Sequence, residues 1–383
     1  MRPQPPVRTL ARLRLAVLLL VLSATAAVTL FAPAAGGFSA WEFRPPASFP
    51  AGPTSLHDFR RWPGRFEAYV GDAFPGRSAL IQARNTLLWR LGLLRSPRVI
   101  EGPEGWLFLS DSWHETLRKS RGLYPFDQDQ AARWTERYES LREVVAGWGG
   151  EVRLVIIPDK QTVYPHYLPE WARPGDPPLP TMTDQILAEL SRRRVAGVLD
   201  LRSVLRTAAV QRPVFWKTDS HWNGHGARVA MEHLLPWLTS SQESAARAVL
   251  GRCQLSASTE PFRGDLANIL GVAGLPAEFD GKLRLDPPAM THAIPWQGMG
   301  GGQLRTPFRT AVPGGSPGKL LVLGDSFLDT SWFVLAELKA ETAFFPHHDL
   351  RISRTLLEQE RPNTVLLIIV ERLIPAAGPK LLP

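Results

Sequence analysis

The chain has a single cysteine, Cys253, among its 383 residues. One cysteine can form neither an intrachain disulfide nor a thiolate metal cluster, which excludes disulfide-rich scaffolds and cysteine-ligated zinc sites. It does not exclude an exported protein, because many exported proteins fold without disulfides. We expect Cys253 to be a buried free thiol, the common role of an isolated cysteine.

The sequence also lacks a concentrated run of basic residues. Its formal net charge is +8, from 44 Lys and Arg against 36 Asp and Glu, but the arginines are scattered along the chain. Without a basic cluster or a recognisable nucleic-acid module, the sequence predicts no nucleic-acid binding. An anionic polysaccharide or a membrane surface suits the charge better, and genomic composition alone also accounts for many arginines and 35 prolines.

Composition excludes a disordered chain. Hydrophobic residues make up 44% and charged residues 21%, so the chain can bury a core sufficient for one large domain or two smaller ones. We find no internal repeat in the sequence.

An uncharged, mostly apolar run extends from Leu15 to Ala35, after several arginines in residues 1–14. Its length suits a helix that spans a bilayer. The positive-inside rule places residues 1–14 in the cytoplasm and everything after the run outside it. The sequence therefore predicts a cytoplasmic tail (1–14), a transmembrane signal anchor (15–35) in the inner membrane, and a periplasmic location for the rest of the chain.

A cleaved signal peptide is the alternative for the same segment. Ala24-Thr25-Ala26 and Ala32-Pro33-Ala34 are both small-residue sites of the kind that signal peptidase cuts. We favour the anchor because the apolar run is longer than a usual signal-peptide core. Cleavage would leave a soluble periplasmic protein, so both alternatives export the rest of the chain.

The remainder predicts an α/β fold. Residues 36–55 are rich in Pro, Gly and Ala without periodicity, which predicts a linker before a domain at 56–383. Residues 245–314 show few clear helices or strands and are expected to cross over the candidate site that is described below. Helical spacing and apolar runs alternate elsewhere and predict a parallel sheet covered by helices on both faces. The expected helices lie at 59–94 with a break at 74–76, 126–148 and 182–194; the expected strands lie at 152–157, 197–201, 319–323 and 364–370, with a hairpin at 99–109.

Two short motifs carry candidate chemistry. Gly324-Asp325-Ser326-Phe327 follows the apolar run 319–323, and Asp219-Ser220-His221-Trp222 lies earlier in the chain. A serine hydroxyl becomes nucleophilic when an imidazole takes its proton and a carboxylate holds that imidazole in the right tautomer. Ser326, His221 and Asp219 are the candidates for these roles. Because Asp219 and His221 lie two apart, an extended segment points both to one face.

Local sequence suits this interpretation, but each residue also has an ordinary structural alternative. A turn from strand to helix at Ser326 would expose its Oγ beside backbone N–H groups that can stabilise an oxyanion, and Gly324 permits such a turn. Ser326 could equally cap a helix, and His221 could be a buried, hydrogen-bonded histidine. The two motifs together favour catalysis over either alternative.

A metal site is a further alternative, because His221 and His225 lie four apart and Asp219 is close by. The sequence offers neither a third strong ligand nor the glutamate of a His-Glu-x-x-His protease. Glycines on both sides of His225 also weaken a continuous helix there. We therefore predict no metal.

Polar residues follow two of the predicted strands. Glu371 and Arg372 follow the strand nearest the C-terminus, and Lys160 and Tyr164 follow the strand that ends at Ile157. Open α/β sheets bind ligands at the carboxyl ends of their strands. These four residues are candidates for substrate binding or for support of the acid–base network, and a surface ion pair is the alternative for Glu371 and Arg372.

Two further candidates lie near the histidine motif or after it. Asp265, in Gly264-Asp265-Leu266, is a candidate supporting carboxylate. Trp222 is expected to pack against the His221 loop rather than to stack on a sugar, although an indole ring suits both.

These motifs resemble the alginate O-acetyltransferases of the AlgJ and AlgX type, a branch of the SGNH hydrolase superfamily. The resemblance covers most of the chain after the apolar segment. In ordinary SGNH esterases the serine comes first and an Asp-x-x-His comes near the end, whereas here the order is reversed with a one-residue spacer, as in the acetyltransferase branch. The resemblance to this family rests on seven stretches of sequence. They are Asp219-Ser220-His221-Trp222-Asn223, Gly324-Asp325-Ser326-Phe327, Phe74-Pro75-Gly76-Arg77, Gly105-Trp106-Leu107-Phe108, Pro158-Asp159-Lys160 with Tyr164-Pro165, Gly264-Asp265-Leu266 and Val370-Glu371-Arg372.

The resemblance implies an SGNH-type fold and an exported polysaccharide O-acetyltransferase. It implies a Ser-His-Asp triad that works through an acetyl-serine, a polysaccharide acceptor, and a polytopic membrane acyltransferase that supplies the acetyl donor, with no cofactor or metal. A carbohydrate acetylesterase with the same triad and a non-catalytic polysaccharide-binding or assembly protein are the alternatives. Alginate, cellulose or another exopolysaccharide fits the sequence equally well.

Overall fold

The computed structural model describes residues 46–74, 76–239, 243–257, 260–275, 277–290, 293–295, 307–346 and 350–382, together with Ser23. The predicted tail and anchor thus lie outside the described residues, Ser23 apart. Among the helices that are described, none is long and apolar enough to cross a membrane. The chain divides into two compact units, Met1–Arg95 with Asn268–Leu275, and Ser96–Ala267 with Pro276–Pro383. Residues 56–383, expected to form one domain, contribute to both.

In the described part of the first unit, α2 (Leu56–Ala73) is followed by α3 (Arg77–Arg90), with the break where the sequence predicted it. Ser55 caps α2, because its Oγ accepts the N–H of Asp58 at 3.1 Å. The α3 residue Asn85 donates its Nδ2 to the carbonyl of Leu270 at 3.0 Å. The segment Asn268–Leu275 therefore belongs with these helices although it lies far along the chain.

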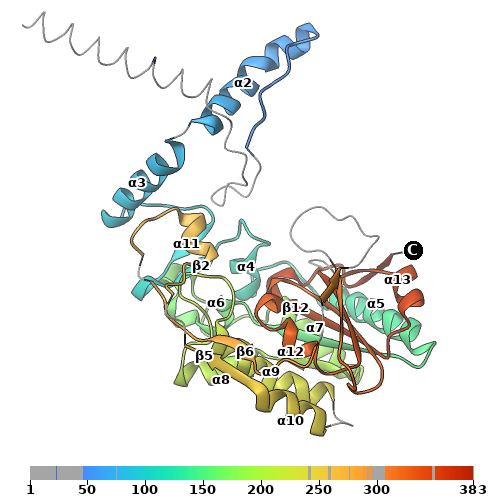
Figure 1. The fold of residues 1–383 in the computed structure, drawn as a ribbon. Coiled ribbons are helices and arrows are strands. Elements are labelled where there is room, and N and C mark those ends of the chain that lie inside the picture. The colour runs from blue at the N-terminus through green and yellow to red at the C-terminus, as the bar shows by residue number, and fades with distance from the viewer. Residues whose placement is uncertain are drawn as a thin grey trace, which may run out of the picture. The chain divides into compact units, whose positions relative to one another are not determined.

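The second unit is built on a seven-stranded sheet in the order β4-β3-β12-β9-β10-β8-β7 (Figure 1). The five strands from β4 to β10 run parallel, and β8 and β7 run antiparallel to their neighbours. The sheet is therefore mixed, which corrects the predicted parallel sheet. The strands are β4 (Val198–Asp200), β3 (Glu151–Ile157), β12 (Thr364–Val370), β9 (Lys319–Gly324), β10 (Glu341–Pro346), β8 (Phe308–Ala311) and β7 (Ala293–Pro295).

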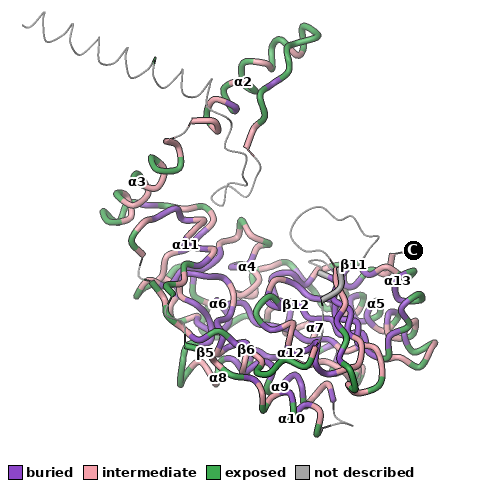
Figure 2. The backbone as a smooth tube through the Cα atoms, viewed as in Figure 1, coloured by how far each residue is buried: buried purple, intermediate pink, exposed green. Residues whose placement is uncertain are grey.

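The parallel strands form the core of the second unit. All seven residues of β12 are buried, and since alternate residues point to opposite faces, both faces of the sheet are covered there. This explains the unbroken apolar run in its sequence. Figure 2 shows buried backbone concentrated in these strands, and β8 is only partly buried. A short edge strand leaves no long apolar run, which is why the antiparallel strands escaped prediction.

Helices with clear sequence signals pack around the sheet. Helix α5 (Gln128–Ala146) starts with a capping box between Asp127 and Gln130, and it packs against β3 and against α7 (Met182–Arg192). The two green helices α5 and α7 lie together in Figure 1. Helix α8 spans Arg202–Gln211 and α9 spans Gly224–Leu238. Asn223 caps α9, because its Oδ1 accepts the N–H of Gly226 at 2.9 Å.

Residues 245–314 contain more structure than predicted. Helix α10 (Glu243–Arg252) leads into β5 (Cys253–Ser256), which pairs with β6 (Lys282–Leu285), and the short helix α11 (Asp265–Leu270) lies between them. The expectation of few elements was wrong because each element is short and its partner lies far along the sequence. Cys253 is buried and free, as predicted.

The remaining elements are short and mostly connect the larger ones. The predicted hairpin is confirmed as the antiparallel pair β1 (Val99–Glu101) and β2 (Leu107–Leu109). The others are α4 (Thr116–Ser120), α6 (Lys160–Val163), α12 (Trp332–Leu335), β11 (Arg351–Ser353), α13 (Arg354–Glu360), β13 (Lys380–Leu382) and the 3-10 helices η1 (Pro103–Gly105), η2 (Pro165–Tyr167), η3 (Glu170–Ala172), η4 (Ser326–Thr330) and η5 (Glu371–Leu373).

Strand register determines which loops meet. Ile157 pairs with Val370, and Gly324 pairs with Ile368 on the other side of β12. The segments that follow β3, β9 and β12 therefore emerge next to one another at the carboxyl edge. These segments carry the polar residues that the sequence analysis singled out.

Candidate active site

The candidate nucleophile, Ser326, is the first residue of η4, directly beyond the end of β9. The preceding residue, Asp325, is fully buried and holds this turn in place. Its Oδ1 accepts the N–H of Phe327 at 3.0 Å, and its Oδ2 accepts the N–H of Val370 at 2.7 Å. The turn is thus fastened to the end of the central strand, and the predicted helix after it is a single 3-10 turn.

Gly324 is needed here for space. A Cβ at this position would overlap the side chain of Leu328. Gly324 is not among the glycines with positive φ, so a left-handed turn is not the reason for the glycine. Gly324 thus serves close packing and not the sharp turn predicted from the sequence.

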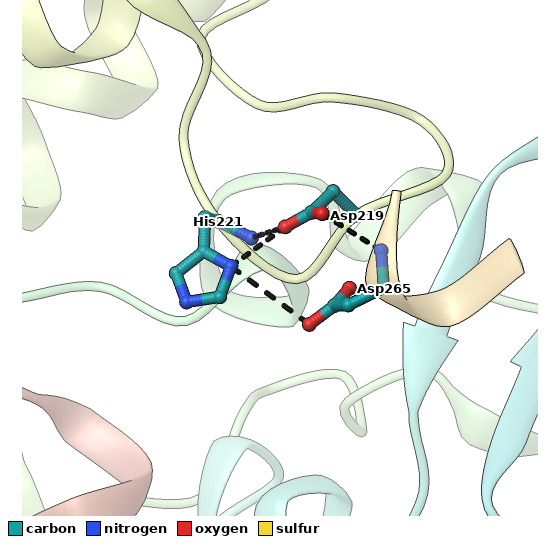
Figure 3. Close-up of side chains that lie close together, drawn as sticks. All are labelled: Asp219, His221 and Asp265. Atoms are coloured by element: carbon teal, nitrogen blue, oxygen red, sulfur yellow. Dashed lines mark hydrogen bonds and ion pairs between the residues drawn. The ribbon is translucent and has the colours of Figure 1, made fainter. Parts of the chain in front are cut away.

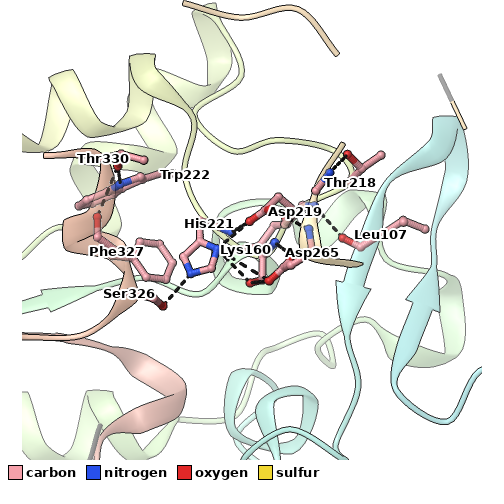
Figure 4. A network of polar contacts seen from close by, with 12 residues as sticks. Leu107, Lys160, Thr218, Asp219, His221, Trp222, Asp265, Ser326, Phe327 and Thr330 are labelled. Atoms are coloured by element: carbon pink, nitrogen blue, oxygen red, sulfur yellow. Dashed lines mark hydrogen bonds and ion pairs between the residues drawn. The ribbon is translucent and has the colours of Figure 1, made fainter. Parts of the chain in front are cut away.

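His221 lies between the serine and a carboxylate, as Figure 4 shows, and Figure 3 shows the carboxylate side alone. Its Nε2 lies 2.7 Å from Ser326 Oγ, and its Nδ1 lies 2.6 Å from Asp219 Oδ1. Asp219 Oδ1 also accepts the backbone N–H of His221 at 2.8 Å. The structure brings the three predicted residues into one continuous hydrogen-bonded chain, with the histidine–aspartate pair formed locally as expected.

The protonation states of His221 and Asp219 are set by burial and by hydrogen bonding. Burial disfavours the charged imidazole, but the hydrogen bond that His221 donates to Asp219 and the charge of Asp219 outweigh burial, so the pKa of His221 is raised above its usual value. For Asp219, burial is outweighed by the same partner and by backbone N–H groups, and its pKa is lowered. Asp219 is therefore ionised whenever His221 takes a proton.

Asp265 fixes the segment that carries the dyad. Its backbone N–H donates to Asp219 Oδ2 at 2.8 Å, and its carboxylate accepts the N–H and the hydroxyl of Ser220 at 2.7 and 2.5 Å. Its Oδ2 lies 3.8 Å from His221 Nδ1 (Figure 3). Burial and the neighbouring charge of Asp219 raise the pKa of Asp265.

Asp219, His221 and Asp265 also form a group whose ligand atoms lie within 4.8 Å of one another. Each oxygen of the two carboxylates already accepts a protein N–H or O–H, and both ring nitrogens lie at hydrogen-bonding distance from Asp219 or Ser326. His221 precedes α9 whereas His225 lies within it, so the two histidines do not share a helix face. The protein's own hydrogen bonds account for this donor set.

Lys160 supports the site from beneath (Figure 4). It is 1% exposed, and its Nζ donates to the carbonyls of Leu107 and Lys217 at 2.7 Å and to that of Asp219 at 3.0 Å. Burial lowers its pKa to about 7, although the acidic groups Glu278, Asp219 and Asp265 act in the opposite direction. Lys160 therefore ties the segment before His221 to β2.

Two aromatic candidates have packing roles. The Tyr164 hydroxyl accepts the N–H of Val214 at 2.8 Å, and burial raises the Tyr164 pKa to about 12. Trp222 is 1% exposed, meets the Phe327 ring edge-on at 5.1 Å, and donates its Nε1 to Thr330 Oγ1 at 2.8 Å. Trp222 therefore packs against the turn that carries Ser326, whereas the sequence predicted packing against the His221 loop.

Glu371 and Arg372 lie behind the nucleophile turn. Arg372 Nη1 donates to Asp159 Oδ1 at 2.5 Å, and its guanidinium lies 5.5 Å from the centre of the Phe327 ring. Glu371 accepts the N–H of Asp159 at 2.9 Å and the hydroxyl of Thr162 at 2.6 Å. Burial raises the pKa of Glu371 to about 7. Both side chains are buried, so the surface ion pair considered from the sequence was wrong.

A cavity of about 440 Å³ opens beside Ser326 and His221. Among the six supporting residues predicted from the sequence, Trp222 borders it, and Lys160, Tyr164, Asp265, Glu371 and Arg372 do not. Several bordering residues come from the 245–314 segment, which was expected to cross over the site. The residues that sequence reasoning missed here are Trp216, Phe262, Lys282, Leu283, Asp329 and Phe333.

Comparison with known proteins assigns a family to this site. Residues 99–287 match the family described as the SGNH hydrolase-like domain of acetyltransferase AlgX. In this region the chain is similar to the AlgJ/AlgX-type family. The matched range contains Asp219, His221 and Asp265 and ends before Ser326.

Individual relatives agree with the family. The probable alginate O-acetylase AlgJ of Pseudomonas syringae pv. tomato is 25% identical over 244 residues, which cover 60% of this chain and 56% of that protein. Its counterpart from Pseudomonas putida is 29% identical over 177 residues, covering 45% of this chain and 42% of that protein. The chain therefore spans about half the length of the curated relatives that it matches.

Two solved structures are more distantly similar. The O-acetyltransferase domain of Pseudomonas putida AlgJ shares 19% identity at a TM-score of 0.43, covering 72% of this chain and 92% of that domain. Bacillus cereus PatB1 with a sulfonyl adduct shares 13% identity at a TM-score of 0.49, covering 71% of this chain and 94% of PatB1. The family assignment rests on the sequence matches.

Proposed function

We propose that the protein is an exported polysaccharide O-acetyltransferase in which Ser326, His221 and Asp219 transfer an acetyl group through an acetyl-serine intermediate. The observation that carries the proposal is the chain of contacts from Ser326 Oγ to His221 at 2.7 Å and from His221 to Asp219 at 2.6 Å, next to a cavity. Similarity to the AlgJ/AlgX-type family supports acetyl as the group that is transferred.

In the first half of the reaction, Ser326 is acetylated. His221 Nε2 takes the proton of Ser326 as Oγ attacks the acetyl carbonyl of the donor. The charge that develops on the carbonyl oxygen is stabilised by the N–H of Ser326 and by a neighbouring loop, because the N–H groups of Phe327 and Leu328 already donate to Asp325. When the tetrahedral intermediate collapses, the imidazolium protonates the leaving group, and acetyl-Ser326 remains.

The second half unloads the serine. A sugar hydroxyl enters, His221 takes its proton, and the new alkoxide attacks the acetyl-serine carbonyl. The bond to Ser326 Oγ then breaks, and His221 returns the proton to the serine. Ionised Asp219 stabilises the charged imidazole in both halves, which fits the raised pKa of His221.

Water competes with the sugar as the acceptor. The side chains of Trp216, Phe262, Leu283 and Phe333 border the cavity, so much of its wall cannot hydrogen-bond water. This favours transfer over hydrolysis when a sugar is positioned. The same triad with water as the acceptor would be an acetylesterase.

The proposal extends to location and partners. Residues 15–35 anchor the chain in the inner membrane, with the catalytic unit in the periplasm; signal cleavage would instead leave it soluble there. The acetyl donor comes from a polytopic membrane acyltransferase and the acceptor is a polysaccharide. No nucleic acid or cofactor takes part.

The test is an acetyl-transfer assay with purified protein, 4-nitrophenyl acetate as the donor, and an oligosaccharide. We expect mass spectrometry to show acetylated oligosaccharide with the wild type and none with Ser326→Ala. Release of acetate without acetylated sugar would identify an esterase. If a sulfonyl fluoride leaves Ser326 unlabelled and no donor is consumed, the protein is a non-catalytic binding or assembly factor.

A further inference from the structure

The wall of the cavity beside the triad contains a second built feature, a stacked aromatic pair. The rings of Trp216 and Phe262 lie 4.1 Å apart between centroids, with an interplanar angle of 24°. Both residues border the same cavity as Ser326 and His221. We propose that this pair is the shelf on which the acceptor sugar stacks, and this inference rests on the proposed function.

Glu278 holds the two rings together. Its carboxylate accepts the N–H of Lys217 at 2.5 Å and the N–H and hydroxyl of Thr218 at 2.8 and 2.5 Å, directly after Trp216. Its backbone pairs with Phe262, through N–H to carbonyl bonds of 2.9 and 3.4 Å. One residue therefore fixes the backbone beside Trp216 and the backbone of Phe262. This fixed geometry distinguishes the shelf from a chance contact between exposed rings.

Exposure indicates which ring meets the ligand. Trp216 is 8% exposed, whereas Phe262 is only half-buried. The Trp216 ring thus supports the stack, and Phe262 presents the accessible face. Trp222 is nearly fully buried and is fastened to Thr330, so it does not serve as the stacking platform.

The shelf fits a pyranose ring. One face of many pyranoses carries several C–H groups in a nearly flat arrangement, and such an apolar face packs well on an aromatic ring. A cavity of about 440 Å³ lies within the usual range for small-molecule sites, roughly 300–1,000 Å³. An acetyl group alone is too small to need two stacked rings, whereas an acceptor must be oriented so that one hydroxyl faces the acetyl carbonyl. We therefore assign the shelf to the acceptor and not to the donor.

The experiment measures binding without catalysis. Calorimetric titration of the full chain carrying Ser326→Ala with cellohexaose, which is neutral, and with a mannuronate hexamer, which is anionic, gives a Kd for each sugar. Adding Phe262→Ala should weaken binding of whichever hexamer binds by about tenfold, and Phe262→Tyr should restore it, because an aromatic face is what the sugar needs. The control is Phe279→Ala, since Phe279 is 62% exposed and does not border the cavity.

The outcomes separate the shelf from the proposed reaction. Binding that depends on Phe262 but not on Phe279, to either hexamer, supports the shelf, and the sugar that binds reports whether the acceptor is neutral or acidic. Equal Kd values for the Phe262→Ala variant and its parent, or no binding of either hexamer to the parent, overturn it. If the shelf binds sugar but the wild type never acetylates Ser326, the proposed function fails and the binding site remains.

A steady-state measurement in the Ser326-containing protein gives an independent check. Phe262→Ala should raise the KM for the oligosaccharide by a larger factor than it changes hydrolysis of 4-nitrophenyl acetate. If acetylation of the oligosaccharide and hydrolysis of 4-nitrophenyl acetate fell equally, Phe262 would belong to the donor side or to the general structure. That result would overturn the acceptor shelf.

Discussion

The two sides of the triad are built differently. Behind it, Lys160, Glu371 and Arg372 are buried polar groups at the carboxyl ends of parallel strands, and their hydrogen bonds go to protein atoms. In front of it, Trp216 and Phe262 form an apolar wall contributed by a loop and by the 245–314 segment. The first side positions the reacting groups and the second meets the ligand. Positioning of the triad and contact with the ligand are therefore assigned to different side chains.

The largest effect is expected for substitution of His221, the general base that lies between the two sides. His221→Gln removes the proton acceptor for Ser326, so donor turnover should fall by roughly 10⁴- to 10⁶-fold. Release of 4-nitrophenol measures it. His225→Gln is the matched control, because His225 lies in α9 and does not border the cavity. Equal activities of the two variants would remove His221 from the mechanism.

A smaller but large effect is expected behind the triad. Lys160→Met deletes the three hydrogen bonds to the carbonyls of Leu107, Lys217 and Asp219, so the base should shift relative to Ser326. A displacement of about 1 Å costs on the order of 10²-fold in kcat. We expect kcat for the donor to fall by that order with little change in KM.

The control for this variant is Lys217→Met in the same segment, where the side chain is 38% exposed. Thermal melting shows whether the Lys160→Met protein is folded at the assay temperature. A folded variant with wild-type kcat would contradict the positioning role of Lys160.

In front of the triad, Glu278→Gln should act more on the acceptor than on the donor, although it also removes one of the charges that raise the pKa of Lys160. One amide oxygen cannot replace a carboxylate that accepts three hydrogen bonds, so the Trp216–Phe262 stack should loosen. We expect the oligosaccharide KM to rise by roughly tenfold, as for loss of one well-placed stacking or hydrogen-bond contact. Donor hydrolysis should stay within twofold. A drop in donor hydrolysis without a change in the acceptor KM would reverse the division between the two sides.

The smallest effect is expected for Asp265→Asn, and it lies in the pH profile. The charge of Asp265 helps to raise the pKa of His221, so its removal should move that pKa down. Because the neutral imidazole is the active base, activity rises as the pH rises through this pKa, and the acidic limb should shift to lower pH. The amide can still accept from Ser220, so activity at the optimum should change by only a few-fold. A limb that stays in place or shifts upward would contradict this electrostatic role.

Much of the site could be predicted because its signals are local. Asp219 and His221 lie two residues apart, and Ser326 follows an apolar strand, so short stretches of sequence carry the information. The helices at Leu56–Ala73 and Gln128–Ala146 were equally clear, since apolar spacing and a capping residue mark each one. Which residues gather at the carboxyl edge followed from the strand ends alone.

The parts of the site and the fold that were not predicted depend on contacts between segments that lie far apart in the sequence. Phe262 lies next to Trp216 only because β5 and β6 pair around the intervening chain and Glu278 bonds to both places. No periodic pattern marks such a contact. Likewise, the edge strand β7 and its neighbour β8 are short, so their sequence resembles a loop, and the mixed character of the sheet was not predictable from it.

The most direct test of the account is intact-mass and peptide mass spectrometry of the wild-type protein after brief exposure to an acetyl donor and acid quenching. We predict one added acetyl group, mapped to Ser326, that disappears when oligosaccharide is added before the quench. The Ser326→Ala protein should gain none. A wild type that consumes donor without acetylating Ser326, or that carries the acetyl group on another residue, would contradict the account.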